Sequence, residues 1–172
     1  MTGFGSPPPY PPPPPPPPRA AFPQQLHIVA MVGGICLVVG SLLIWTRVEG
    51  PTVEPGTRYG FRGTSGDGVW TLILGVLIVG LAIVAMAARK PVLNAIAGIP
   101  GLFATIIALI NLANPDRVAR ADTESEIPVS DLMWELAMAN FEFHSALGIF
   151  VVSAGALASV IAGILAATNL RN

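Results

Sequence analysis

The chain is poor in charged residues. Asp, Glu, Lys and Arg make up 11% of its 172 residues, whereas about 25% is typical of soluble domains. Hydrophobic residues account for 52% and mean hydropathy is +0.66. We therefore expect most of the chain to be surrounded by lipid, which makes the lipid bilayer a partner of this protein. The net charge of −1 gives no general attraction to nucleic acid, and no nucleic-acid partner is expected.

Cysteine and histidine are also rare, which excludes several kinds of site. The single cysteine, Cys36, cannot form an internal disulfide or a CxxC metal site. The two histidines, His27 and His144, begin the first and last apolar runs and should lie about 30 Å apart, at opposite membrane surfaces. Glu142 and His144 stand two residues apart, and on a helix such side chains point apart. We therefore expect no metal, no cofactor and no catalytic residues; the protein is not expected to be an enzyme.

Four runs of at least 20 residues contain no charged side chain, namely 26–45, 69–88, 92–112 and 143–167. A bilayer core of ~30 Å needs ~20 helical residues. Lipid offers no partner to backbone N–H and C=O groups, so a spanning segment must be a helix or part of a closed barrel. Barrel strands alternate apolar and polar residues, and these runs do not. The sequence predicts an all-α integral membrane protein, with a four-transmembrane-helix bundle over residues 26–172.

Prolines dominate residues 1–25, with eight in a row at Pro11–Pro18. Polyproline has no donor N–H and rises ~3.1 Å per residue. This segment is therefore expected to be a disordered, Pro-rich cytoplasmic tail or a stiff spacer. Its Pro8-Pro9-Tyr10 is superficially similar to a WW-domain ligand, but such matches arise easily in a proline tract.

The charged residues that remain predict the topology. Residues 46–68 and 113–142 form two loops on one side of the membrane, and all 10 carboxylates fall there. The short Arg89-Lys90-Pro91 turn forces spans two and three into a hairpin. Basic residues that flank spans favour the cytoplasm. The two sides are nearly balanced, with four basic residues on the side of the termini and five on the side of the loops. Because Arg89 and Lys90 adjoin two spans at once, whereas Arg47, Arg58 and Arg62 have acidic neighbours, we predict a multi-pass protein of the plasma membrane with both termini cytoplasmic and both loops facing outward.

The third run contains Gly98, Pro100 and Gly101. An interior proline removes a helical hydrogen bond, and flanking glycines add to the effect, so a kink is predicted near mid-membrane. A kinked helix can line a substrate path, or the bend can serve packing alone. The packing interpretation is preferred, because no carboxylate, Lys or Arg lies deep in a run and ion paths usually need one.

The fourth run carries small residues at every fourth position: Gly155, Ser159, Gly163 and Ala167. This spacing stacks them on one helix face, and small faces let membrane helices approach closely. The neighbour could lie within the chain or in another protein, with packing inside the chain as the default. Small residues that could supply the facing surface are Gly33, Gly34, Gly40, Ala97 and Gly101.

Two features stand out in the loops. Gly66, Asp67 and Gly68 lead into the second run, so the glycines should form a tight turn and Asp67 should cap the free N–H groups of the helix. Residues 130–143 predict a helix that begins at Ser130, either as an interfacial amphipathic helix or as an outward extension of span four. There Trp134, Glu135 and Phe143 could form a docking surface, although a solvated acidic face is the simpler interpretation.

The layout resembles a group of small membrane proteins of mycobacteria and other actinobacteria. The resemblance rests on the Pro-rich, Tyr-containing tail, on Trp45 at the end of the first span, and on Gly66-Asp67-Gly68 before Trp70-Thr71-Leu72. It implies four spans and no catalytic residues. A few proteins of comparable layout are accessory subunits of envelope assemblies such as Mce-type lipid importers or respiratory supercomplexes.

The leading functional hypothesis is a non-enzymatic accessory subunit of a larger cell-envelope membrane complex, with a membrane protein as its partner. It rests on the small-residue face of span four, on the tail and outward loops as surfaces available to a partner, and on the lack of reactive groups. One alternative is a small transporter or channel that uses the third span. A third hypothesis is an outward-facing sensor or lipid-binding protein built on the two loops.

Overall fold

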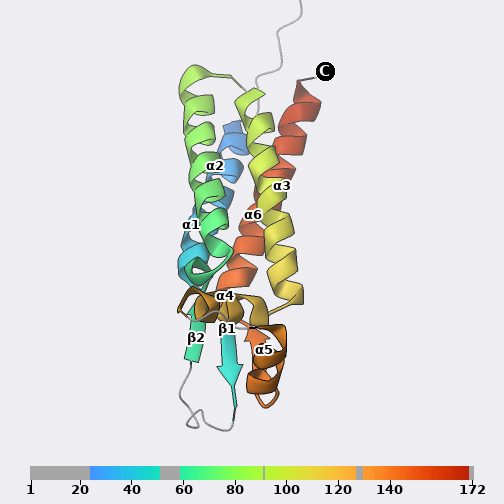
Figure 1. The fold of residues 1–172 in the computed structure, drawn as a ribbon. Coiled ribbons are helices and arrows are strands. Elements are labelled where there is room, and N and C mark those ends of the chain that lie inside the picture. The colour runs from blue at the N-terminus through green and yellow to red at the C-terminus, as the bar shows by residue number, and fades with distance from the viewer. Residues whose placement is uncertain (1–23, 51–58, 91, 127–129, 171–172) are drawn as a thin grey trace, which may run out of the picture.

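The computed structural model describes residues 24–50, 59–90, 92–126 and 130–170 (Figure 1). The predicted Pro-rich tail, residues 1–25, lies outside the described residues except for its last two. These two glutamines, Gln24 and Gln25, already belong to the first helix.

Four long helices run side by side and confirm the predicted four-helix bundle. They are α1 (Gln24–Leu42), α2 (Gly68–Ala88), α3 (Val92–Ala113) and α6 (Leu147–Asn169). All four are long and apolar enough to cross a membrane. They pack in the order α1-α2-α3-α6 around the bundle, so that α1 lies diagonally across from α3.

Small residues fill the bundle and large ones cover it. The described alanines at positions such as 82, 97, 104, 156 and 162 are fully buried, whereas Val32, Ile73, Phe103 and Ile161 are about half exposed or more. This distribution suits a chain whose outer surface faces lipid, because backbones approach closely over small side chains while large apolar side chains meet the acyl chains. The bilayer is therefore the environment of this bundle.

The start of α1, the α2–α3 turn and the end of α6 lie together at one end, which we name the termini side (Figure 1). In the turn, Arg89 adopts a left-handed conformation with φ 52°. Its N–H donates to Met86 O and that of Lys90 donates to Ala85 O, which closes the helix in the position that glycine usually takes. The two long helices are thereby folded into the expected hairpin.

The opposite end, the loop side, carries a folded cap instead of the two predicted loops. A three-stranded antiparallel sheet has the order β2-β1-β3, with β1 at Ile44–Glu49, β2 at Tyr59–Arg62 and β3 at Glu142–Ser145. A short 3₁₀ turn, η1 (Gly63–Ser65), leads to α2, and two further helices, α4 (Asp116–Glu126) and α5 (Asp131–Met138), complete the cap.

The sheet shortens two of the predicted spans. The first was expected to reach Trp45 but ends at Leu42, and the fourth was expected to start at Phe143 but starts at Leu147. The reason is strand pairing: Thr46 pairs with Phe61 on one side and with Ser145 on the other. Because β3 separates α5 from α6, the predicted outward extension of span four is wrong.

Trp45 joins the cap to the bundle. Its side chain is 1% exposed and its indole N–H donates to Gly40 O at 2.9 Å. Gly63 and Gly148 lie against the ring, and a Cβ at Gly63 would come within 2.4 Å of it. Trp45 belongs to one buried cluster with Leu37 of α1 and neighbouring residues of α4 and α6. The packing of this cluster holds the cap on the bundle.

Candidate functional site

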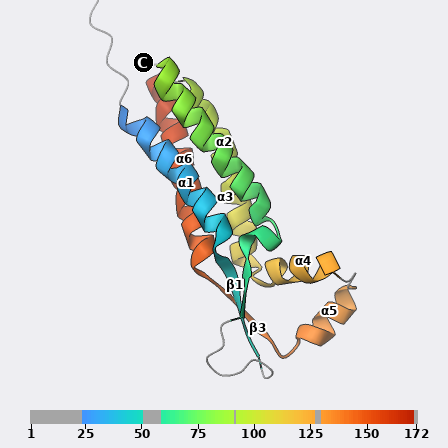
Figure 2. The same cartoon turned by 90° about the vertical axis from the view of Figure 1, so that its left-hand side faces the viewer.

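The cap is the part of the described chain in which polar and aromatic side chains gather around cavities. Helix α4 lies across the loop-side end of the bundle, and α5 lies farther out, beyond α4 (Figure 2). Val118 of α4 is buried in the central cluster with residues of the spans, so α4 is the cap helix that packs directly on the bundle. Its other two faces border two separate cavities.

A carboxylate at the start of α2 ties three helices together. Asp67 Oδ2 accepts from Arg117 Nε at 2.7 Å and from Asn111 Nδ2 at 3.1 Å. Asn111 stands near the end of α3 and is 4% exposed, while Arg117 opens α4 and is about half exposed. Charge-assisted hydrogen bonds of this kind are among the stronger ones. Asp67 therefore fixes the direction in which α4 leaves α3.

The prediction that Asp67 caps α2 is wrong in its mechanism. The residue stands at the N-cap, but its side chain makes no capping hydrogen bond and its backbone, at φ −61° and ψ −14°, is already helical. A capping side chain needs an extended backbone at that position. Of the two glycines, only Gly68 is required by a close approach: a Cβ at Gly68 would lie 2.4 Å from the Gly63 carbonyl, whereas one at Gly66 would make ordinary contacts from 3.4 Å.

A second set of ion pairs holds α5 to α4. Arg120 donates from Nε to Glu124 at 2.7 Å, one turn along α4, and from Nη2 to Asp131 at the start of α5. The hydrogen bonds with Glu124 and Asp131 raise the pKa of the Arg120 guanidinium above its ordinary value. The Ser130 hydroxyl caps α5 by accepting from Met133 N–H at 3.4 Å, so the predicted helix start is correct.

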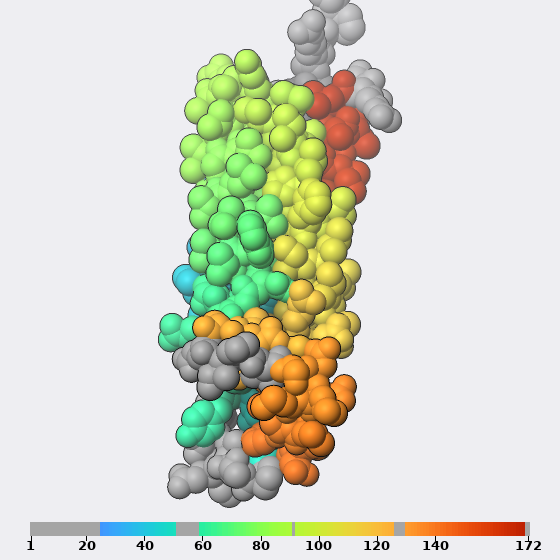
Figure 3. Space-filling view, in the orientation of Figure 1, coloured from blue at the N-terminus to red at the C-terminus, as the bar shows by residue number. Residues whose placement is uncertain are grey.

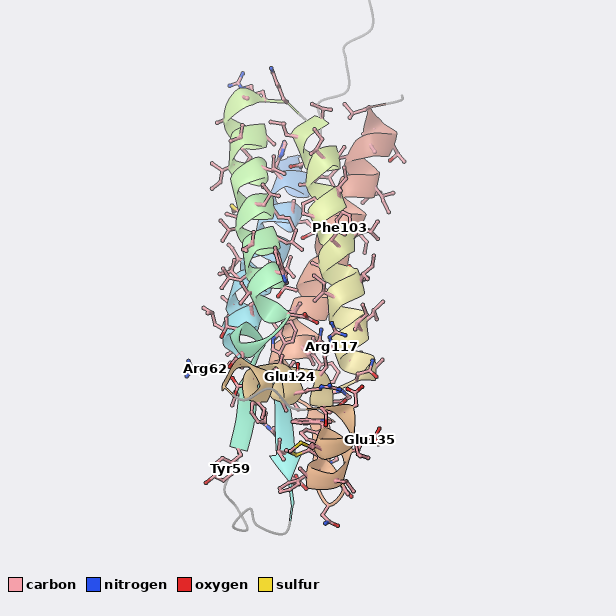
Figure 4. The ribbon with its side chains drawn as sticks, viewed as in Figure 1. Tyr59, Arg62, Phe103, Arg117, Glu124 and Glu135 are labelled. Atoms are coloured by element: carbon pink, nitrogen blue, oxygen red, sulfur yellow. The ribbon has the colours of Figure 1, made fainter. Side chains whose placement is uncertain are left out.

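The polar cavity, of about 430 Å³, lies along these ion pairs. Figure 4 labels two of its lining residues on α4, Arg117 and Glu124. Its two guanidinium groups already have carboxylate partners. Among the described residues that line it, the cavity therefore offers no unpaired cation for an anionic ligand. Residues that line it include Asp67, Asn114, Asp116, Arg117, Arg120 and Glu124.

The apolar cavity, of about 320 Å³, lies between the sheet and the α4–α5 layer. Trp134 of α5 forms one wall and stacks on Phe143 of β3, with ring centroids 6.3 Å apart. Ala119 and Thr123 contribute the α4 face. None of the described residues that line this cavity is charged, so its chemistry is that of an apolar binding site.

The predicted docking residues therefore divide into two groups. Trp134 is 6% exposed and faces inward with Phe143, whereas Glu135 points away from the cap (Figure 4). The outer face of α5 instead presents Leu132, Met133 and Leu136, which are 66%, 63% and 69% exposed. In the space-filling view α5 stands out beyond α4 (Figure 3). The helical spacing of these three residues in the sequence is enough to predict the exposed apolar face. The burial of Trp134 could not be predicted in this way, because it depends on the contact with Phe143 of β3.

Glu142 and His144 correct another expectation. They lie on β3, where residues two apart point to the same face, and the His144 Nε2 to Glu142 Oε2 distance is 3.5 Å. The helical geometry assumed for this pair was wrong. Within the described ranges, no group of three or more His, Cys, Asp or Glu side chains is placed to hold a metal ion.

The small-residue face of α6 packs inside the chain. A Cβ at Gly155 would lie 2.6 Å from Gly33 O of α1, and one at Gly163 would lie 2.5 Å from Gly98 Cα of α3. Ser159 is buried between the same two helices. Ala167 is exposed instead, because a four-residue spacing drifts about 40° per step around a helix and about 120° over three steps.

Helix α3 is continuous from Val92 to Ala113, with Pro100 inside it and buried. The two glycines of the predicted kink serve close packing: Gly98 meets Gly163, and a Cβ at Gly101 would lie 3.0 Å from the Ser159 side chain. The Gly98, Pro100 and Gly101 region therefore forms the α3 side of the contact with α6.

Most polar groups inside the spans have partners. Ser41 Oγ and Thr71 Oγ1 share a hydrogen bond of 2.7 Å between α1 and α2. Asn94, on the first turn of α3, differs: it is fully buried, and neither atom of its amide has a hydrogen-bond partner among the described residues. An unpaired amide in hydrocarbon is costly, so Asn94 is an energetic weak point of the bundle.

Comparison with known protein families and with curated proteins gives no match to this chain. The description of the chain as a four-span membrane protein with a structured cap rests on its own sequence and structure.

Proposed function

We propose that this protein is a non-enzymatic accessory subunit of a larger cell-envelope membrane complex and that the outer face of α5 binds its partner. The observation that supports this best is the exposure of Leu132, Met133 and Leu136 on an eight-residue helix. Single exposed apolar residues are common, but a contiguous apolar patch marks an interaction surface.

The position of α5 favours a protein partner over lipid for this patch. The spans contain 18 to 23 residues, or about 27 to 35 Å at 1.5 Å per residue, which matches a hydrocarbon core of ~30 Å. Helix α4 lies at the end of the spans, and α5 lies beyond it. A helix layer adds about 10 Å, which carries α5 past the headgroups of a bilayer about 40–45 Å thick in total.

Two arguments from the sequence lose their support in the structure, one for a partner within the membrane and one for a transporter or channel. The small-residue face of α6 is occupied by α1 and α3, so it gives no support to a partner within the membrane. The glycines of α3 are likewise used in packing, so they give no support to the transporter or channel alternative. The case for a partner therefore rests on the cap.

The orientation and location belong to this proposal. The basic residues Arg89 and Lys90 at the turn support a termini side in the cytoplasm of a plasma membrane, and in this proposal the cap faces outward. The resemblance to small actinobacterial envelope proteins suggests the class of assembly, such as a lipid importer or a respiratory supercomplex.

The test is affinity purification from the native membrane after mild detergent extraction. We expect a partner at fixed stoichiometry with the wild type, lost from the Leu132→Gln/Leu136→Gln variant. Both side chains are mostly exposed, so the change should cost little folding stability. Ala139→Gln, at an exposed position just past α5, is the matched control and should retain the partner. A wild-type protein that elutes alone, or a partner that the double variant retains, would refute the proposal.

A further inference from the structure

The two layers of the cap do not fill the space between them. The apolar cavity of about 320 Å³ is roughly twice the volume of engineered apolar cavities, ~150 Å³, that stay dry and bind benzene or xenon. It also falls in the lower part of the range typical of small-molecule sites, about 300–1,000 Å³. A cavity of this size and lining is suited to a ligand.

The lining indicates the chemistry of that ligand. Aromatic rings come from both layers: Tyr59, Phe61 and Phe143 from the sheet, Trp134 from α5, and Phe141 from the segment between α5 and β3. Two of the described lining residues, Tyr59 and Thr123, carry a hydroxyl, and Tyr59 is 60% exposed. The Thr123 hydroxyl already donates to Ala119 O at 3.0 Å, so it turns a satisfied group toward the cavity. Such a surface offers van der Waals contact and few hydrogen bonds, which favours a hydrocarbon over a polar metabolite.

We propose that the cavity binds a single hydrocarbon chain of an envelope lipid. The cap is built on the end of a bundle whose large outer side chains face acyl chains. The cavity lies between α4, at the end of the spans, and α5, so the acyl chains of the bilayer below α4 are the nearest source of an apolar ligand. The ion pairs of Arg117 and Arg120 stay intact in this proposal, because the cavity lies on a different face of α4. The site is independent of the α5 outer face and goes beyond the accessory-subunit proposal.

Trp134 provides the readout, because bromine atoms on an acyl chain quench tryptophan by contact. The parent protein carries Trp70→Phe, which removes an indole that is 61% exposed on the lipid-facing surface. Subtraction of the same protein with Trp134→Phe leaves the emission of Trp134. The protein is placed in nanodiscs of dibrominated phosphatidylcholine, or in nanodiscs of unbrominated lipid to which dibrominated stearic acid is added. The first arm reports a bilayer phospholipid chain and the second a free fatty acid.

The control variants lie on the same helix. Ala119→Leu fills the cavity from α4, and Thr123→Met fills it independently. Ala121→Leu, which lines the polar cavity on the other face, is the matched control. We expect saturable quenching of Trp134 in at least one arm, reduced severalfold by either filling variant and unchanged by Ala121→Leu.

Two outcomes would overturn the proposal. Absence of Trp134 quenching in both arms would show that no chain enters the cavity. Quenching that persists equally in Ala119→Leu, Thr123→Met and Ala121→Leu would show that the cap dips into the bilayer. The assay contains no partner protein, so absence of quenching would leave the proposal for Leu132 and Leu136 untouched, and a missing partner would leave this one untouched. Quenching that persists in all three variants would also count against the α5 proposal, because it would place that face in lipid.

Discussion

Gly163 on α6 offers the sharpest test of how the spans pack. A Cβ there would lie 2.5 Å from Gly98 Cα and 2.9 Å from Gly98 N, both backbone atoms that cannot turn aside. Ordinary contact begins at 3.4 Å, so Gly163→Ala must move α3 and α6 apart by 3.4 − 2.5 = 0.9 Å. Overpacking of this kind costs about 1–3 kcal/mol, which lowers the ratio of folded to unfolded protein roughly 5- to 150-fold relative to an alanine placed in a helix without a clash.

Gly80→Ala is the control, because Gly80 lies in the helix interior of α2 with nothing within 4 Å of its would-be Cβ. Both variants gain the same helix propensity, about 1 kcal/mol, so their difference isolates the clash. Gly98→Ala should fall between them, since its Cβ would lie 3.0 Å from Gly163 Cα. The assay is reversible unfolding in mixed micelles, followed by far-UV circular dichroism as the fraction of SDS rises. Coincident curves for Gly163→Ala and Gly80→Ala would refute this packing.

Three further predictions follow from buried groups and ion pairs. Trp45→Ala should lower the free energy of unfolding by about 3–5 kcal/mol, because Trp45 is buried. Trp70→Ala, at a lipid-facing residue, should lower it by less than about 1 kcal/mol. Equal losses in the same unfolding assay would contradict the role of Trp45. Asn94→Leu should raise that free energy by about 1–3 kcal/mol because it removes an unpaired amide, whereas a loss of stability would show that the amide has a partner. Arg120→Ala should speed amide hydrogen exchange in α5 severalfold while exchange in the spans stays constant, since Arg120 ties α5 to α4; unchanged exchange in α5 would mean that other contacts hold it.

The spans could be predicted because each one is a local property of the sequence. An uncharged run such as 92–112 needs no knowledge of the rest of the chain, and α3 extends it by one residue. The order of the helices and the use of Gly155 and Gly163 in contacts inside the chain required the structure. Four-residue spacing marks a face, but it does not identify what covers that face.

The cap could not be predicted in the same way, because its strands are short and pair over long distances. Burial alternates from Thr46 to Glu49, and this alternation depends on the pairing of Val48 with Tyr59 and with Phe143, the latter far away in sequence. Ile44, Trp45 and Val48 are residue types that are common in strands. Ile44 and Trp45 also continue the uncharged run 26–45, however, and the length of that run favours a membrane span. Asp67 illustrates the same limit, since its partner Arg117 lies 50 positions away.

The most direct test of the four-span account is the sidedness of two surface positions in intact cells. Single cysteines are introduced as Lys90→Cys in the α2–α3 turn and Glu135→Cys on α5, in a Cys36→Ser background, because Cys36 is the one native cysteine. A membrane-impermeant maleimide should label position 135 in intact cells and position 90 only after the cells are opened. Labelling of both positions from outside would contradict the four-span account. Labelling of position 90 alone would reverse the proposed orientation.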